Sequence, residues 1–172
     1  MSRNSLSFAF PALVSVFVTA LVAVGYPYDV AHQDPIAKLA FLMGAAAVLS
    51  LASVRVDRGH LTLLGLAIGA TAILLNPLDA ALVGLAMVIG QVRRPLLHVL
   101  TNASVHAAIA SLGATVAIHL EPGGTLSLAA RLTVLVLSNV ADIALVALGL
   151  SLRTGESIAS ILRHNLGICL SG

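Results

Sequence analysis

Five polar side chains interrupt two long apolar runs of the sequence at helical spacing. His98, Asn102 and His106 follow one another at steps of four in the first run. Asn139 and Asp142 lie three residues apart in the second run. Residues three or four apart share one face of an α-helix, so each set can present amide and ionisable groups to a neighbouring helix. These residue types support hydrogen bonding between helices, proton-linked switching and metal ligation.

Two of these side chains, His106 and Asp142, are expected at the same depth in a helical bundle. His106 lies eleven residues after Pro95, which is ~16 Å along a helix, and Asp142 lies ten residues before Leu152, which is ~15 Å. The short break "EPGG" between the two runs makes their helices antiparallel neighbours. The asparagine of each set is then expected at a similar level.

Three interpretations of the cluster Asn102, His106, Asn139 and Asp142 remain open. We favour an interhelical hydrogen-bond cluster, in which Asp142 pairs with His106 and the two asparagines cross-link the helices. The second is a functional pocket for a ligand, or a proton-responsive His–Asp switch. The third is a metal site, which we do not expect because the spacing lacks HxH or HxxxH and offers no fourth donor. His98 is expected among lipid headgroups.

The composition defines the solvent around these groups. Of the 172 residues, 59% are hydrophobic and 9% are charged, whereas a soluble domain carries about a quarter charged residues. Lipid tails solvate an apolar surface that water would not. The composition therefore predicts an integral membrane protein with the lipid bilayer as its first partner. The nine Lys and Arg residues are spread over short loops and form no patch, so we expect no nucleic-acid binding, and the single Cys169 excludes an internal disulfide.

Hydrophobic segments between short polar breaks predict an all-α, polytopic bundle of six transmembrane spans. These expected spans are 8–25, 36–54, 61–75, 80–92, 95–120 and 126–152. The third and fourth reach only ~20 Å, short of the ~30 Å hydrocarbon core, and are expected to form a re-entrant hairpin or to cross a thinned membrane. Gly65 and Gly69 form a GxxxG pair, which favours close helix packing.

Charged residues in the breaks predict the orientation. Seven of the nine basic residues fall on one side if the N-terminus is cytoplasmic, while the acidic residues of the opposite loops are Asp29, Asp34, Asp79 and Glu121. This bias follows the positive-inside rule and predicts a multi-pass protein of the cell membrane with both termini inside. The expected topology anchors are Arg55, Arg58, Arg93, Arg94 and Arg153.

The sequence divides into residues 1–152, the expected transmembrane domain, and residues 153–172. The second segment is expected to be a cytoplasmic juxtamembrane tail or the truncated start of a further span. No GxSxG, Walker loop, HExxH or paired CxxC motif occurs. We therefore expect no enzyme activity, no catalytic residues and no cofactor.

Several short motifs together resemble a known family. The order "NPLD", "RRPLLHVLTNA", "LSNVADIALVALGLSLRTGES" and "RHN" is similar to MASE-type N-terminal membrane sensor regions of bacterial signalling proteins, over roughly residues 61–166. The arginine pair Arg93–Arg94 before a buried asparagine, Asn102, matches that pattern, and Asn139 and Asn165 match its later asparagines. The resemblance implies a bacterial inner-membrane input module for a diguanylate cyclase, an HD-type phosphodiesterase or a histidine kinase.

The chain departs from that family because "GICLSG" follows without a soluble output domain. A fragment, or a detached input module with a cytoplasmic signalling partner, is therefore expected, and a homo-oligomer remains open. The expected mechanism is a two-state rearrangement of the last two spans, passed to the cytoplasm through the Arg153 segment. Two alternatives stand beside it: a vitamin-type substrate-binding subunit of an energy-coupling-factor transporter, and a structural membrane protein without a ligand.

Overall fold

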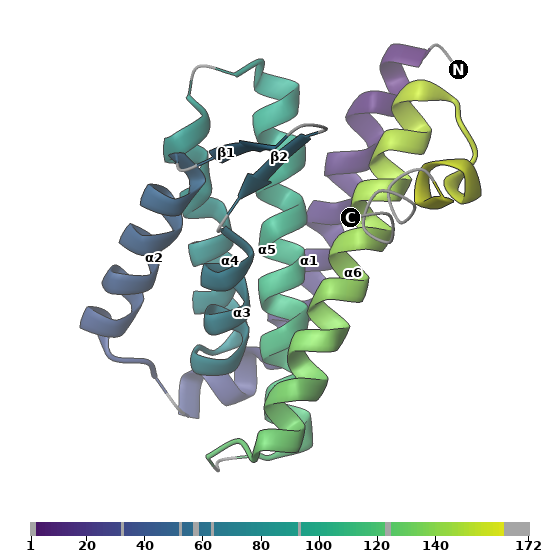
Figure 1. Cartoon of the computed structure of the whole chain (residues 1–172). Coiled ribbons are helices and arrows are strands. Elements are labelled where there is room, and N and C mark those ends of the chain that lie inside the picture. The colour runs from purple at the N-terminus through teal and green to yellow at the C-terminus, as the bar shows by residue number, and fades with distance from the viewer. Residues whose placement is uncertain are drawn as a thin grey trace.

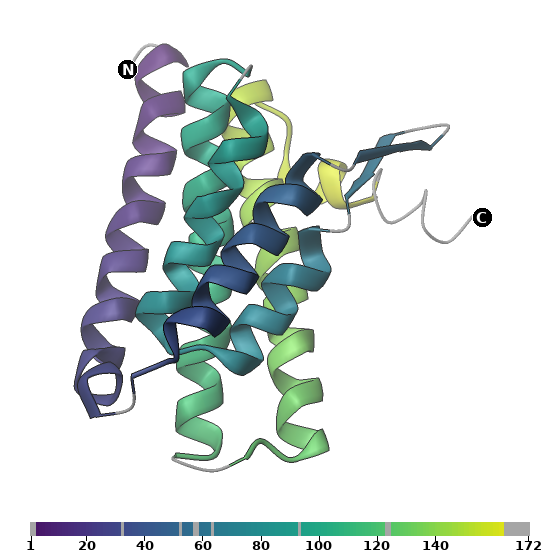
Figure 2. The ribbon, with the colours of Figure 1, turned by 90° about the vertical axis from the view of Figure 1, so that its left-hand side faces the viewer.

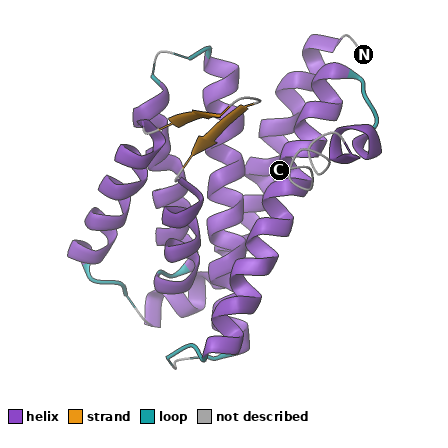
Figure 3. Cartoon of the chain, viewed as in Figure 1, coloured by secondary structure: helices purple, strands orange, loops and turns teal. Residues whose placement is uncertain are grey.

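The computed structural model describes residues 3–31, 33–51, 53–56, 59–62, 64–92, 94–122 and 125–163. For residues 3–7 and for the two strands, only the backbone is described. The chain folds into a bundle of helices with one small β-hairpin (Figures 1 and 3). The helices are α1 (Arg3–Ala31), α2 (Ile36–Leu51), α3 (Leu64–Leu74), α4 (Pro77–Ala86), the 3₁₀ helix η1 (Met87–Gln91), α5 (Leu96–Leu120) and α6 (Leu128–Thr154).

Three helices are long and apolar enough to cross a membrane. They are α1 from Phe8 onward, α5 and α6, while α2, α3 and the α4–η1 segment are apolar but shorter. Large apolar side chains point outward along the bundle and remain exposed, including Leu13, Val16, Phe41, Leu132, Val136 and Val140. A surface of this kind suits lipid rather than water. The fold thus has the features of a helical membrane protein.

The helices run alternately in opposite directions (Figures 1 and 2). The α1–α2 link, the α3–α4 turn and the α5–α6 loop meet at one end, where Asp34, Asn76 and Glu121 line a common surface hollow. We call this the acidic end. The start of α1, the β-hairpin, the start of α5 and the last turn of α6 lie toward the other end, which we call the basic end because Arg94 and Arg153 lie there.

Helix α5 is the centre of the bundle and packs against α1, α3, α4 and α6. In its most apolar stretch 67% of the residues are buried, against 22% in α1 and in α6. Small side chains make this possible, since Ala107, Ala108, Ala110 and Ala114 are almost fully buried. At Gly84 of α4 an added Cβ would lie 2.6 Å from the Cα and N of Ala107, so the two backbones nearly touch there.

The β-hairpin departs from the expected all-α fold. Strands β1 (Ser53–Val56) and β2 (Gly59–Thr62) pair antiparallel, with Arg55 opposite His60. They occupy the predicted end of the second span and the predicted start of the third. The sequence "SVRVDRGHLT" alternates β-branched and polar residues around a turn-forming Asp-Arg-Gly, which favours a hairpin over a continued helix.

Helix α1 is longer than the predicted first span. It continues past Gly25 and through Pro27 to Ala31, so that Asp29, expected in a loop, lies on its last turns. Proline removes one main-chain hydrogen bond, and this loss is tolerated close to a helix end. An added Cβ at Gly25 would lie 2.6 Å from the ring of Pro77, so α1 approaches the start of α4 closely here.

Helix α6 extends slightly beyond the predicted domain boundary at residue 152. It begins after Ser127, whose hydroxyl accepts a hydrogen bond from the amide of Ala130, and it ends at Thr154 before Gly155, which adopts φ 79°. A left-handed glycine at this position is a common helix stop. The following segment is helical again at 158–163, and the rest of the predicted tail lies outside the described residues.

Candidate functional site

A cavity of about 260 Å³ lies where α3, α5 and α6 meet. Three of the four predicted cluster residues line it, namely His106 from α5 and Asn139 and Asp142 from α6. The remaining lining residues are Gly65, Ile68, Gly69, Ile109 and Ser138. We call it the α3–α5–α6 cavity, and it combines apolar walls with a few polar groups, as ligand pockets do.

Helical spacing and small residues account for this arrangement. His106 and Ile109 are three residues apart on α5, and Gly65 and Gly69 are four apart on α3, so each helix turns one face to the cavity. Two turns further along α5, Gly113 holds the three helices together. An added Cβ there would lie 2.6 Å from the Cβ of Ala72 and 2.7 Å from the Oγ of Ser138.

The polar groups of the cavity are not joined to one another. The Nδ2 of Asn139 donates to the carbonyl of Leu135 on its own helix, at 2.8 Å, and so does not cross-link the helices. Within the described residues, no hydrogen bond or ion pair joins His106 to Asp142, and the buried hydroxyl of Ser138 has no hydrogen-bond partner. His106 and Asp142 therefore line the same cavity, but they do not form the direct pair that the sequence predicts.

Asn102 lies apart from the other three residues. Its Nδ2 donates to Oε1 of Gln91 at 3.0 Å and lies 3.1 Å from Nε2 of His98. These three side chains, Gln91, His98 and Asn102, form a separate polar cluster toward the basic end. This cluster links η1 to the first turns of α5. His98, expected to be solvated among headgroups, is half-buried in this cluster.

Sequence reasoning missed Gln91 as the partner of Asn102. The only available signal was its position, since it is the last polar side chain before the arginine pair. A step of four residues also turns the helix face by about 40°. That rotation moves Asn102 off the wall that His106 shares with α6.

The structure describes some of the predicted topology anchors and not others. Arg94 and Arg153 are exposed toward the basic end, and Arg55 lies in β1, where only the backbone is described. Arg58 and Arg93 fall outside the described residues. In the part of the chain that the structure describes, no three His, Cys, Asp or Glu side chains come close enough to hold a metal ion.

Comparisons with protein-family models, with curated proteins and with solved structures find no match for this chain. The class defined by its own features is a helical membrane protein with a small polar cavity between its last two long helices and α3.

Proposed function

We propose that this chain is a six-span sensory module of the cell membrane, with the N-terminus and the end of α6 on the cytoplasmic side. The MASE-type resemblance supports this proposal, and so does the separation of charge between the two ends of the bundle. Arg94 and Arg153 lie at the basic end, as the positive-inside rule favours for a cytoplasmic side, while Lys38 and Arg131 lie at the acidic end. The short helices α3 and α4–η1 would then cross as a tightly packed pair shielded by α2 and α5.

The observation that carries the sensory proposal is the α3–α5–α6 cavity. A polar group inside a membrane protein is expensive unless it is partnered or has a task. Here Ser138 is buried without a partner in the described structure, and His106 and Asp142 face the same space without bonding to each other. A ligand or a proton that binds in this cavity would change the contacts between α5 and α6.

Helix α6 is the element best suited to move in response. Its outer face is largely exposed, and it touches the bundle mainly through α5, with smaller contacts to α3 and α1. It ends at Thr154, directly after Arg153, at the basic end. A shift of α6 relative to α5 would therefore reach the segment that follows it. Such a shift requires that the signal bind the two arrangements with different affinity.

Distance measurements between spin labels test this proposal. With Cys169→Ser as background, labels at Arg94→Cys and Arg153→Cys report the α5 and α6 ends in lipid nanodiscs. The proton is the probe, because His106 and Asp142 are the titratable side chains that line the cavity. Between pH 7 and pH 3.5 we expect two distance populations to exchange weight. Both His106→Ala and Asp142→Asn should abolish the change.

The matched control is Glu121→Gln, which removes a carboxylate outside the cavity and should leave the pH response intact. A response that survives both cavity variants, or no response at all, would contradict the proposal. His106 and Asp142 would then have no part in a pH-driven rearrangement of α5 and α6.

A further inference from the structure

A second cavity, of about 380 Å³, lies at the acidic end between the last turns of α1, the α1–α2 link, the start of α2 and the start of α4. Its acidic lining residues are Asp29, Asp34 and Asp79, and its aromatic one is Tyr26. Apolar side chains, among them Ile36, complete the wall. We call it the α1–α2–α4 cavity. It is separate from the α3–α5–α6 cavity, and no lining residue is shared.

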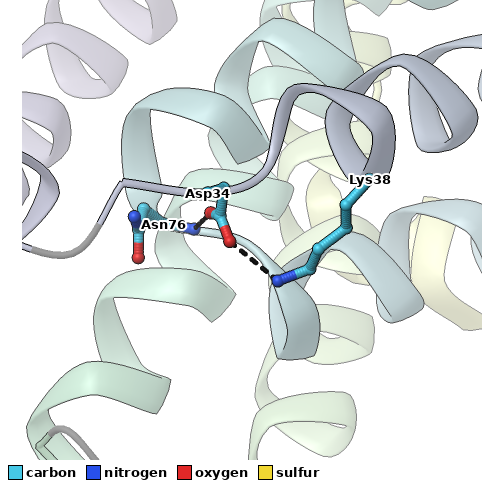
Figure 4. A network of polar contacts seen from close by, with 3 residues as sticks. All are labelled: Asp34, Lys38 and Asn76. Atoms are coloured by element: carbon cyan, nitrogen blue, oxygen red, sulfur yellow. Dashed lines mark hydrogen bonds and ion pairs between the residues drawn. The ribbon is translucent and has the colours of Figure 1, made fainter.

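One of the three carboxylates is already neutralised (Figure 4). The Oδ1 of Asp34 lies 2.7 Å from the Nζ of Lys38, and its Oδ2 accepts a hydrogen bond of 2.7 Å from the backbone amide of Asn76. This network fastens the α1–α2 link to the α3–α4 turn. Lys38 is therefore paired with Asp34, and the described residues contain no other ion pair.

Asp29 has no such partner. Its exposed fraction is 9%, and neither carboxylate oxygen has a hydrogen-bond partner among the residues that the structure describes. The backbone amide of Leu78, in the first turn of α4, lies close to the Asp29 carboxylate but does not form a hydrogen bond with it. Pro77, beside it, has no amide hydrogen to donate. A carboxyl in this state holds its proton unless a counter-ion joins it.

The lining of the cavity defines the chemistry of that counter-ion. A bare metal ion is disfavoured, since no three ligating side chains converge within the described residues. Both Asp29 oxygens are covered in this structure, so a small side-chain movement would be needed before a primary ammonium could donate to the carboxylate and gain from the charge of Asp79. The ring of Tyr26 lines the same cavity and can pack against the hydrocarbon part of such a molecule. The apolar wall then accepts a hydrocarbon group on the same molecule.

We propose that the α1–α2–α4 cavity binds a small organic primary amine in its ammonium form, with Asp29 as the counter-ion and Tyr26 beside the apolar part. This proposal does not depend on the sensory function. A ligand at this position would join α1, α2 and α4 at the acidic end, where the Asp34 network already holds the link in place.

Calorimetric titration of the full chain in detergent micelles tests the proposal with two matched probes. Phenethylammonium carries the charge, and phenethyl alcohol replaces the ammonium by a neutral hydroxyl. We expect the ammonium to bind at least about tenfold more tightly than the alcohol, because a hydrogen bond between charged groups is stronger than one that involves a neutral donor. Because this comparison uses the unmodified chain, it does not depend on the folding of any variant.

Variants then locate the binding site. Asp29→Asn keeps the shape of the side chain and should weaken phenethylammonium binding about ten- to hundredfold, and Asp79→Asn should weaken it less. Asp142→Asn removes a carboxylate from the other cavity and should leave the affinity unchanged. Equal binding of the two probes, or an affinity that Asp29→Asn does not alter, would overturn the proposal. Equal losses in Asp29→Asn and Asp142→Asn would overturn it as well.

Discussion

Hydroxyl groups inside the bundle mostly bond to their own helix. Thr71 and Thr115 each donate to the carbonyl four residues earlier, both at 2.7 Å. This local bond satisfies a polar group in an apolar medium without a partner helix. Ser138 makes no such bond within the described structure, although it is 4% exposed. It is therefore the residue at which the α3–α5–α6 cavity departs from the pattern of the rest of the bundle.

Replacing Ser138 by alanine tests that assignment. We expect Ser138→Ala to leave the free energy of unfolding unchanged or to raise it by about 1 kcal/mol, because an unsatisfied buried hydroxyl is removed. Unfolding in mixed micelles, followed by circular dichroism, measures the change. Ser111→Ala is the control, since Ser111 donates to the carbonyl of Ala108 at 3.3 Å. A loss of more than about 1 kcal/mol on Ser138→Ala would show that the hydroxyl has a partner.

Glu121 shows the opposite situation at the exposed α5–α6 loop. The hydroxyl and the backbone amide of Ser127 donate to its carboxylate, the amide at 2.7 Å, and these bonds lower the pKa of Glu121. A carboxyl with a lowered folded pKa stabilises the loop above the unfolded pKa. That contribution is lost as the pH falls through the folded pKa.

Ser127→Ala should therefore raise the pKa of Glu121 toward its ordinary value of 4.5. Carbon-13 chemical shifts of the Glu121 carboxyl, followed between pH 2 and pH 7, measure it. The same variant removes the N-cap of α6, which should lower stability by about 1 kcal/mol at every pH. Thr125→Ala, in the same loop, should leave the pKa in place. An unchanged pKa in Ser127→Ala would rule out the hydroxyl as the cause.

Helix α4 depends on α5 through the close approach at Gly84. An added Cβ at Gly84 would lie 2.6 Å from the backbone of Ala107, so one of the two helices would have to move to accommodate it. We expect Gly84→Ala to lower the free energy of unfolding by about 1–3 kcal/mol, the usual range for overpacking. Gly44 on α2 is the matched control, since nothing lies within 4 Å of an added Cβ there.

Gly44→Ala should be neutral or stabilising by up to about 1 kcal/mol, because alanine is the better helix former. Thermal unfolding of both variants in the same detergent compares them directly. If the two variants unfold at similar temperatures, α4 and α5 can move apart at Gly84 without a loss of stability, and the expected overpacking is contradicted.

Some helices could be predicted from the sequence to within a few residues, and others could not. The α5 and α6 segments were predicted closely, because a long apolar run between polar breaks has few alternatives in a membrane. Counting residues also placed His106 level with Asp142, since the helical rise is nearly constant. The pairing of β1 with β2 depends on local turn chemistry that hydropathy does not report. The burial of Asp29 was missed because α1 continues through Pro27 to Ala31, whereas the first span was expected to end at residue 25.

At the scale of the whole molecule, the two ends of the bundle differ in charge. Arg94 and Arg153 lie at the basic end, and Asp29, Asp34, Asp79 and Glu121 lie at the acidic end beside Lys38 and Arg131. The arginines of the basic end predict that the acidic end faces away from the cytoplasm. With Cys169→Ser as background, Thr125→Cys should react with a membrane-impermeant maleimide in intact cells. Arg94→Cys should react only after the membrane is made permeable. Labelling in the reverse pattern, or of both sites in intact cells, would contradict this orientation.

The central position of α5 has a consequence for synthesis. Protein segments become available in chain order as they are made, and three of the four helices that pack on α5 precede it: α1, α3 and α4. The surfaces of α1, α3 and α4 that pack on α5 are therefore made before α5 itself. Only the side taken by α6 stays open until that helix is inserted. We therefore expect the cavity around His106, which α6 completes, to close only after α6 is inserted.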